Sequence, residues 1–177
     1  MSINKIIVIM LAIFILEGSL LPWIIPEGFG TRIIPHFTFV MVMYAAIYSS
    51  RYYALGLGLG FGLLQDILFY GNVIGTHFFF VGIIGYTVGI MFERKRVSIL
   101  AVISIIGIAC LVYDSAVYGI NYVFQMNSGS YAWALLEYIL PSLFLQLFFV
   151  LVVYIPTRKM FEGLITVQYS DVSDEAA

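Results

Sequence analysis

Long apolar runs separated by short polar segments are the feature that most limits what this chain can fold into. A helix needs about 20 apolar residues to cross the ~30 Å hydrocarbon core of a membrane. Six runs are candidates, and the second is the shortest, so we expect it to tilt little or to begin in the membrane interface. In chain order they are Ile3–Ile25, Pro35–Tyr48, Tyr53–Tyr70, Thr76–Phe92, Val97–Phe124 and Tyr131–Ile155. The sequence predicts an all-α polytopic membrane protein with six transmembrane helices.

Composition excludes several other classes of protein. Hydrophobic residues make up 62% of the 177 residues and charged residues only 10%, which is more apolar surface than a soluble domain of this size could bury. The net charge of −2 and the lack of a basic patch away from the membrane edges argue against nucleic-acid binding. The single cysteine, Cys110, lies in an apolar run and is interpreted as a small core residue.

The distribution of lysine and arginine predicts the orientation. With six spans, one side of the membrane carries seven basic residues and the other carries Arg32 alone, which predicts that both termini are cytoplasmic. The seven are Lys5, Arg51, Arg94, Lys95, Arg96, Arg158 and Lys159. Lys5 followed by an apolar run resembles a signal peptide, but we interpret this run as a retained span. Residues 1–157 are predicted to form the transmembrane domain, and 158–177 a cytoplasmic, partly disordered tail.

The ionisable groups within the spans all fall in the predicted outer half of the membrane. At ~1.5 Å per residue, Asp66 lies about 20 Å beyond Tyr53, and Asp114 about 25 Å beyond Val97, both in the predicted outer half. Glu17 lies slightly beyond the midplane, and His77 opens the fourth span from outside. This pattern predicts an outward-facing polar depression or partner-binding surface over an apolar floor. A proton or ion path would need polar groups at inner depth as well.

Two interpretations of the polar residues stay open. Asp66 either orients helices within the fold or contacts a partner or ligand. Asp114, Tyr118 and Asn121 form one polar stripe, which either lines a cavity or is solvated at the interface. His36 and His77 are interpreted as polar caps at helix starts, because no metal-binding spacing such as HExxH is present.

Glycines mark close helix packing in the third and fourth runs. Gly58, Gly62 and Asp66 follow at i, i+4, i+8 on one helix stripe, and Gly56 and Gly60 form a second pair on a neighbouring face. Small faces of this kind permit a homodimer. The fourth run adds Gly82, Gly85 and Gly89. The GLGLGFG run does not complete a nucleotide-binding loop, because both GxGxxG registers lack the third glycine.

Catalytic and cofactor patterns are weak. Two intramembrane acids raise the possibility of an aspartyl protease, and Tyr113-Asp114 matches half of that signature. The other half requires Gly-x-Gly directly before its aspartate, and Leu64-Gln65 stands before Asp66. No Ser/His or Cys/His arrangement is recognisable. We therefore expect no enzyme activity, cofactor or metal.

The order of spans and motifs resembles the MreD family of rod shape-determining proteins. The resemblance covers about residues 3–155, and its strongest part is Gly-Leu-Leu-x-Asp followed by a tight glycine turn. Asp114 ahead of Tyr118-Gly119-Ile120 is also similar to the family. The other matching residues are Pro35, Gly58, Gly62, Leu63, Leu64, Asp66, Gly71, Gly75, Gly85, Tyr86 and Gly89.

The resemblance implies a non-enzymatic component of the bacterial cell-elongation machinery that helps position side-wall peptidoglycan synthesis. It implies MreC as a direct partner, with MreB, RodA and a class B penicillin-binding protein in the same complex. Combined with the depth of the acids, it suggests that Asp66, Asp114, Tyr118 and Asn121 line an outer groove for MreC. The glycine faces of spans three and four either pack together or supply that groove.

A second class remains as an alternative. The family is similar in fold to the membrane substrate-binding subunits of energy-coupling-factor vitamin transporters, which bind ligands in an outward-facing pocket. Those subunits commonly carry an Ala-xxx-Ala pattern on the first span. Here Ala12 is followed four residues later by Leu16, so the pattern is missing.

Overall fold

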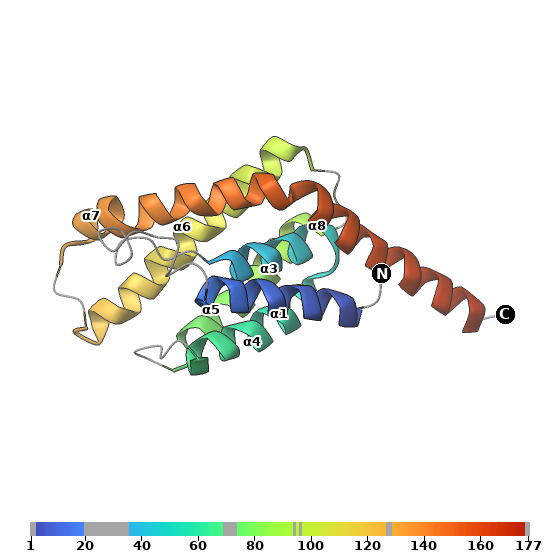
Figure 1. Ribbon diagram of the computed structural model, residues 1–177, viewed down its shortest axis with the longest axis horizontal. Helices are drawn as coiled ribbons and strands as arrows, with labels where there is room; N and C mark the ends of the chain where they lie inside the picture. The colour runs from blue at the N-terminus through green and yellow to red at the C-terminus, as the bar shows by residue number, and fades with distance from the viewer. Residues whose placement is uncertain are drawn as a thin grey trace.

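The computed structural model describes residues 3–19, 36–68, 74–93, 95, 97–126 and 129–175, with side chains described as far as Phe161. Within these ranges the chain is helical and has no strand, which confirms the predicted all-α class (Figure 1). The features expected at Arg32, Pro35, Gly71, Arg94 and Arg96 lie outside the described residues.

Six of the described helices have 12 residues or more. They are α1 (Ile3–Ser19), α3 (Phe37–Tyr48), α4 (Arg51–Leu68), α5 (Thr76–Phe92), α6 (Ile99–Val123) and α8 (Leu140–Glu175). The short helix α7 (Tyr131–Ala134) and the π-helical turn η1 (Leu135–Ile139) precede α8. Each of the first five long helices coincides with one apolar run, displaced by a few residues at most where both ends are described. The sixth run comprises α7, η1 and the first part of α8, which continues beyond the run.

Among the residues that the structure describes, two segments meet the length and hydropathy expected of a membrane span. They are α6, with 25 residues, and the stretch Tyr131–Phe161, with 31 residues. The helices α3 and α5 are also apolar but shorter. Large apolar side chains lie on the outer surface of most helices, among them Leu100, Phe144 and Phe148. Such a surface suits a bundle whose surroundings are lipid rather than water.

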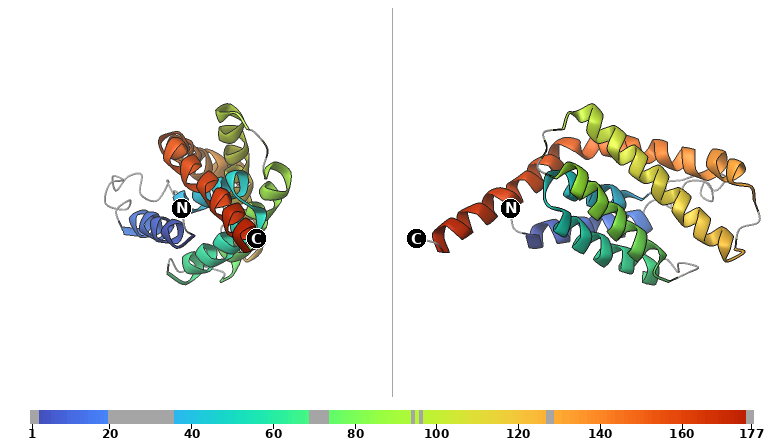
Figure 2. Two further views of the ribbon diagram at one scale, coloured as in Figure 1. Left: turned by 90° about the vertical axis from the view of Figure 1, so that its right-hand side faces the viewer. Right: turned by 180° about the vertical axis from the view of Figure 1, so that it is seen from behind.

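The helix α3, which is the shortest of these six, occupies the centre of the bundle. Its residues from Thr38 to Tyr48 are all buried, and it contacts α1, α4, α5, α6 and α8 (Figure 2). A helix that is apolar on every side has no surface suited to water, which favours a central position. Twelve residues span only ~18 Å, less than the ~30 Å membrane core. The N-terminus of α3 at His36 is therefore buried among the other helices.

The helices α4 and α5 form a tight antiparallel hairpin. The turn between them ends at Gly75, whose φ of +97° lies in the left-handed region that favours glycine. At the opposite end of the hairpin, the Arg51 side chain lies 3.9 Å from the Glu93 carboxylate. The start of α1 and the end of α8 lie toward that same end of the bundle (Figure 1).

The last helix is irregular at its start and unusually long. The π-helical turn η1 precedes Pro141, whose ring would clash with a carbonyl of a regular α-helical turn, and a wider turn relieves that clash. At 36 residues, α8 is ~54 Å long and extends past the rest of the bundle (Figures 1 and 2). Pro156 lies inside α8 and does not end it. Residues 158–175, which the sequence analysis predicted as a partly disordered tail, form the last part of this helix.

Candidate functional site

Polar side chains from four helices, and from the residue before α3, gather toward one end of the bundle. This is the end where α1 and α4 finish and where α3 and α5 begin (Figure 1). Glu17 comes from α1, His36 precedes α3, Asp66 lies on α4, His77 on α5 and Asp114 on α6. These five side chains form three contacts: Glu17 with α3, Asp66 with His77, and His36 with Asp114. We refer to these five residues as the polar cluster.

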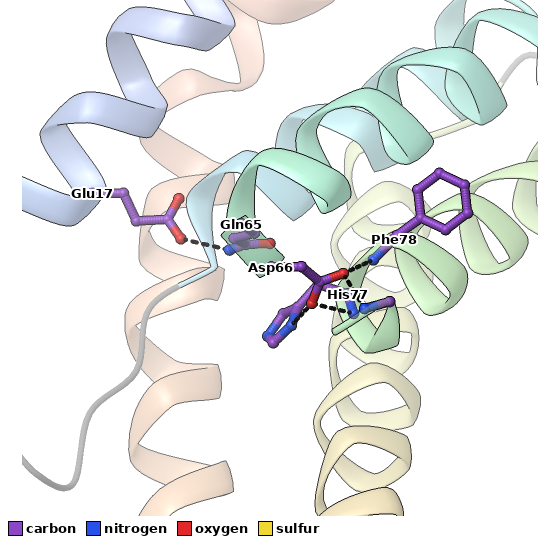
Figure 3. A network of polar contacts seen from close by, with 6 residues as sticks. Glu17, Gln65, Asp66, His77 and Phe78 are labelled. Atoms are coloured by element: carbon purple, nitrogen blue, oxygen red, sulfur yellow. Dashed lines mark hydrogen bonds and ion pairs between the residues drawn. The ribbon is translucent and has the colours of Figure 1, made fainter. Parts of the chain in front are cut away.

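Asp66 caps the helix that follows its own. Its carboxylate accepts backbone N–H groups of Gly75 at 3.0 Å, His77 at 3.2 Å and Phe78 at 3.0 Å (Figure 3). The ring Nδ1 of His77 lies 2.8 Å from the same carboxylate and donates to it when the acid is ionised. The Asp66 side chain is fully buried. All of these partners belong to the turn and first residues of α5.

This cap has a clear physical cause. The first N–H groups of a helix have no acceptor within that helix, and they cost free energy when buried. Gly75, at the capping position of α5, has no side chain with which to accept them. A carboxylate there also interacts favourably with the positive end of the helix dipole. Of the two interpretations open for Asp66, the geometry favours the one in which the acid orients helices.

Glu17 caps α3 in the same way. Its Oε2 accepts the backbone N–H of Thr38 at 2.9 Å and the Thr38 hydroxyl at 2.8 Å, across 21 residues of chain. Its Oε1 accepts the Gln65 amide at 3.3 Å, which links α1 to α4 (Figure 3). An acid near the end of α1 and another near the end of α4 thus each cap the start of the next described helix.

The histidines at the helix starts do not act as caps. His36 occupies the capping position of α3, yet its side chain makes no capping hydrogen bond. Its Nε2 instead lies 3.6 Å from Oδ1 of Asp114, and its ring meets the edge of the Tyr113 ring at 5.0 Å. The expectation that these histidines cap their own helices is therefore wrong, because the carboxylates of Glu17 and Asp66 accept the first N–H groups of α3 and α5 instead.

The predicted stripe on α6 divides into two parts. Asp114 belongs to the polar cluster, whereas the Tyr118 hydroxyl donates to the carbonyl of Gly129 at 2.6 Å in the α6–α7 connection. Tyr118 also stacks on Tyr122 at the end of α6. Asn121 is half-buried, and its carbonyl accepts the N–H of Met126. Tyr118 and Asn121 therefore lie above the polar cluster, nearer the end of the bundle.

Three glycines allow the backbones of α4 and α5 to approach closely. A Cβ on Gly62 would lie 2.7 Å from His77 O and 2.7 Å from the Cα of Phe78. A Cβ on Gly58 would meet Gly82 at 3.0 Å, and one on Gly89 would meet the Arg51 Cα at 2.7 Å. Contacts under 3.0 Å to backbone cannot be relieved by rotating a side chain. The close approach at Gly62 sets the start of α5 against Asp66.

The remaining glycines differ. Gly82 and Gly85 face side chains, since a Cβ would meet Leu59 at 2.6 Å and Val42 at 3.1 Å respectively. Gly56 and Gly60 have no described atom within 4 Å of a Cβ, so they face away from the chain. The expectation that Gly56 and Gly60 pack helices does not hold within the described chain, because they lie on the face of α4 opposite the hairpin.

The polar cluster does not resemble a protease dyad or a metal site. The carboxyls of Asp66 and Asp114 have different partners, His77 and His36, so they do not share one proton as a catalytic pair would. Among the described residues, no three His, Cys, Asp or Glu side chains are arranged to hold a metal ion. The hydrogen bonds described above instead connect helices.

Four further residues of this region were not predicted as site residues, although Tyr113 was noted as part of the half protease signature Tyr113-Asp114. Thr38 and Gln65 bond Glu17, while Tyr113 and Gln146 are fully buried beside the polar cluster. Gln65 and Gln146 are isolated amides in apolar runs, a signal that could have identified them. Tyr113 gave no such signal, because tyrosine is common in this chain, with 13 copies.

Comparison with known proteins identifies a family to which the chain is similar over most of its length. Residues 2–163 match a family model described as rod shape-determining protein MreD. Neither the comparison with curated proteins nor the comparison with solved structures found a match. The matched range contains every described residue of the polar cluster and of the α4–α5 glycine contacts.

Proposed function

The chain belongs to the MreD family of rod shape-determining proteins, and we propose that it is a non-enzymatic part of the cell-elongation machinery that binds MreC. In this role it helps to organise side-wall peptidoglycan synthesis, in a complex that also contains MreB, RodA and a class B penicillin-binding protein. The observation that supports this proposal is the family match over residues 2–163. The use of the buried acids as helix caps agrees with a role that requires no catalytic group.

The proposal includes six transmembrane helices, an architecture similar to energy-coupling-factor substrate-binding subunits, and cytoplasmic termini. Basic residues support this orientation. Lys5 lies near the start of α1 and Arg51 at the start of α4, while Lys95 follows α5, all at the end opposite the polar cluster. Basic residues favour the cytoplasmic side. The polar cluster then lies toward the outer leaflet.

MreC docks, in this proposal, at the end of the bundle above the polar cluster. Tyr118 and Asn121 are partly exposed there and are able to contact a partner. Asp66 and Glu17 are buried and act from below, by fixing the starts of α5 and α3. Asp114 is nearly buried, and the His77 side chain is partly exposed. In place of the outer groove predicted from sequence, we thus propose a partner surface at Tyr118 and Asn121. The buried acids Asp66 and Glu17 hold the helices beneath this surface in position.

Site-specific crosslinking tests this arrangement. A photoreactive residue at Asn121 or Tyr118 should crosslink to co-expressed MreC, whereas one at the buried Asp66 position should not. Leu100, which is 73% exposed at the opposite end of α6, provides a surface control. Equal crosslinking from Leu100 and Asn121, or none from either α6 position near the polar cluster, would contradict docking at this end.

A second copy of the chain is compatible with the outward-facing pair Gly56 and Gly60, since small residues let helix backbones approach in lipid. The vitamin-binding alternative predicts a small molecule retained on purification. Native mass spectrometry of the protein released from detergent distinguishes these outcomes, because a dimer, a bound vitamin and a bare monomer differ in mass.

A further inference from the structure

Four side chains, two in the polar cluster and two beside it, have buried polar atoms with no hydrogen-bond partner among the described residues. They are the Tyr113 hydroxyl, Nδ1 of His36, Oδ2 of Asp114 and both polar atoms of the Gln146 amide. Tyr113 and Gln146 are completely buried, and His36 and Asp114 nearly so. Two of them, Tyr113 and Asp114, lie on α6, Gln146 lies on α8, and His36 lies directly before α3.

These side chains are neighbours. The His36 ring lies 5.0 Å from the Tyr113 ring and its Nε2 lies 3.6 Å from Asp114. The Gln146 side chain lies beside the Asp114 carboxyl without forming a hydrogen bond of proper geometry. The His77 ring is 6.3 Å from His36 and 6.1 Å from Tyr113. The unpartnered atoms therefore concentrate in one region between α3, α6 and α8.

Such a concentration is unusual because a buried polar atom without a partner costs free energy. Elsewhere this bundle satisfies its buried tyrosine: the Tyr44 hydroxyl donates to the carbonyl of Val150 at 2.8 Å. Buried polar groups that protein atoms leave unpaired are commonly satisfied by internal water, each molecule making about three hydrogen bonds. The contrast between Tyr44 and Tyr113 points to an occupant beside Tyr113.

We propose that His36, Tyr113, Asp114 and Gln146 form an internal binding site for ordered water. The unpartnered groups include donors and acceptors together: the tyrosine hydroxyl, the amide N–H₂ and C=O, and the carboxyl oxygen. Water matches such a mixed set, because each molecule both donates and accepts. A bare cation would leave the amide N–H₂ group unsatisfied, and an anion, which only accepts hydrogen bonds, would leave the amide C=O without a donor.

The position of His77 gives this site a route to the end of the bundle. The His77 side chain is 19% exposed, whereas the neighbouring Asp66 side chain is 0% exposed. His77 is held by Asp66 on one side and faces His36 and Tyr113 on the other. Water that enters the site would pass His77, since it is the most exposed ring of the group.

Radiolytic labelling in H₂¹⁸O tests the proposal directly. X-ray irradiation turns bound water into hydroxyl radicals that modify the side chains next to it. In the full-length protein in detergent, Tyr113 should gain ¹⁸O although its side chain is buried, and Tyr44, equally buried but bonded to Val150, should not. Absence of label on Tyr113, or equal labelling of the two tyrosines, would overturn the proposal.

A substitution pair provides a second, independent test. If water bonds the Tyr113 hydroxyl, Tyr113→Phe should lower the melting temperature by about 2–4 °C, as expected for the loss of one hydrogen bond in a protein of this size. Tyr44→Phe, which removes a direct hydrogen bond, provides the reference. An unchanged or higher melting temperature for Tyr113→Phe would mean that the hydroxyl is bare. A bound molecule heavier than water, seen by native mass spectrometry and lost in Gln146→Leu, would also contradict the proposal.

Discussion

The Nδ1 atom of His77 lies 2.8 Å from Oδ1 of Asp66, across the turn that joins α4 to α5. The same carboxylate accepts three backbone N–H groups of that turn and of the start of α5. An acid deep in an apolar run is expensive unless it is paired. Here its partners are the N–H groups that the start of α5 would otherwise leave unsatisfied. The hydrogen bonds therefore offset both the cost of burying the carboxylate and the cost of burying those N–H groups.

Removing the charge of Asp66 should weaken this hairpin. In Asp66→Asn the amide N–H₂ group faces backbone donors, which leaves at least one buried N–H without an acceptor. We expect a loss of about 1–3 kcal/mol in the free energy of unfolding, the usual cost of an unsatisfied buried group. Thermal unfolding in detergent measures the change.

Thr87→Val is the control for Asp66→Asn, because the Thr87 hydroxyl bonds only a carbonyl of its own helix. It should unfold close to the parent temperature. If Asp66→Asn were as stable as Thr87→Val, the capping role of Asp66 would be refuted. Reduced crosslinking to MreC in a correctly inserted Asp66→Leu protein would show that docking depends on the position of α5.

The contact between Glu17 and Thr38 should appear as a coupling energy. Glu17→Gln and Thr38→Val each disturb the cap of α3, and the double variant should lose less stability than the two single losses added together. We expect a coupling of about 1–2 kcal/mol, as found for contacting hydrogen-bonded pairs. Equilibrium unfolding of the parent and three variants measures it, and strict additivity would contradict the contact.

Two glycines on α4 should respond in opposite ways to alanine. In Gly62→Ala the new methyl group meets the backbone of His77 and Phe78 at 2.7 Å, so α5 must move away from Asp66. A loss of about 1–3 kcal/mol is expected, the range for overpacked sites. Gly60→Ala meets no described atom within 4 Å and removes a flexible residue from a helix.

The Gly60→Ala protein is thus the matched control for Gly62→Ala, and it should be as stable as the parent or more stable. Melting temperatures of both variants in one detergent make the comparison. A larger loss in Gly60→Ala than in Gly62→Ala would mean that the outward face of α4 packs against a second copy or another protein. Repeating the measurement after dilution would show whether that contact is between copies.

The turn glycine should not tolerate a side chain. Gly75 has a φ of +97°, and an L-residue in the left-handed region costs roughly 1–2 kcal/mol. Gly75→Ala should lower stability by about this amount, although open space surrounds the position. Gly75→Asn should lose less, because asparagine tolerates this region better. Equal stability of Gly75→Ala and the neighbouring variant Ile74→Ala, exposed in the parent, would contradict the strained turn.

The amino-acid sequence by itself determined the helical class, the number of long helices and the end of the bundle that carries the acids. These properties follow from run length and from the rise of a helix, which are local quantities. Local spacing also placed Gly58 and Gly62 on one helix face, because residues four apart lie together on a helix.

Only the tertiary structure decided what the acids do and which helix lies in the centre. Glu17 caps Thr38 across 21 residues and Asp66 caps α5 across a turn, and no local pattern states which distant N–H group a carboxylate will meet. The apolar run of α3 has no polar side that would place it, so its central position depends on the five helices around it. Whether Gly56 or Gly58 faces α5 depends likewise on how the two helices rotate against each other, which packing alone determines.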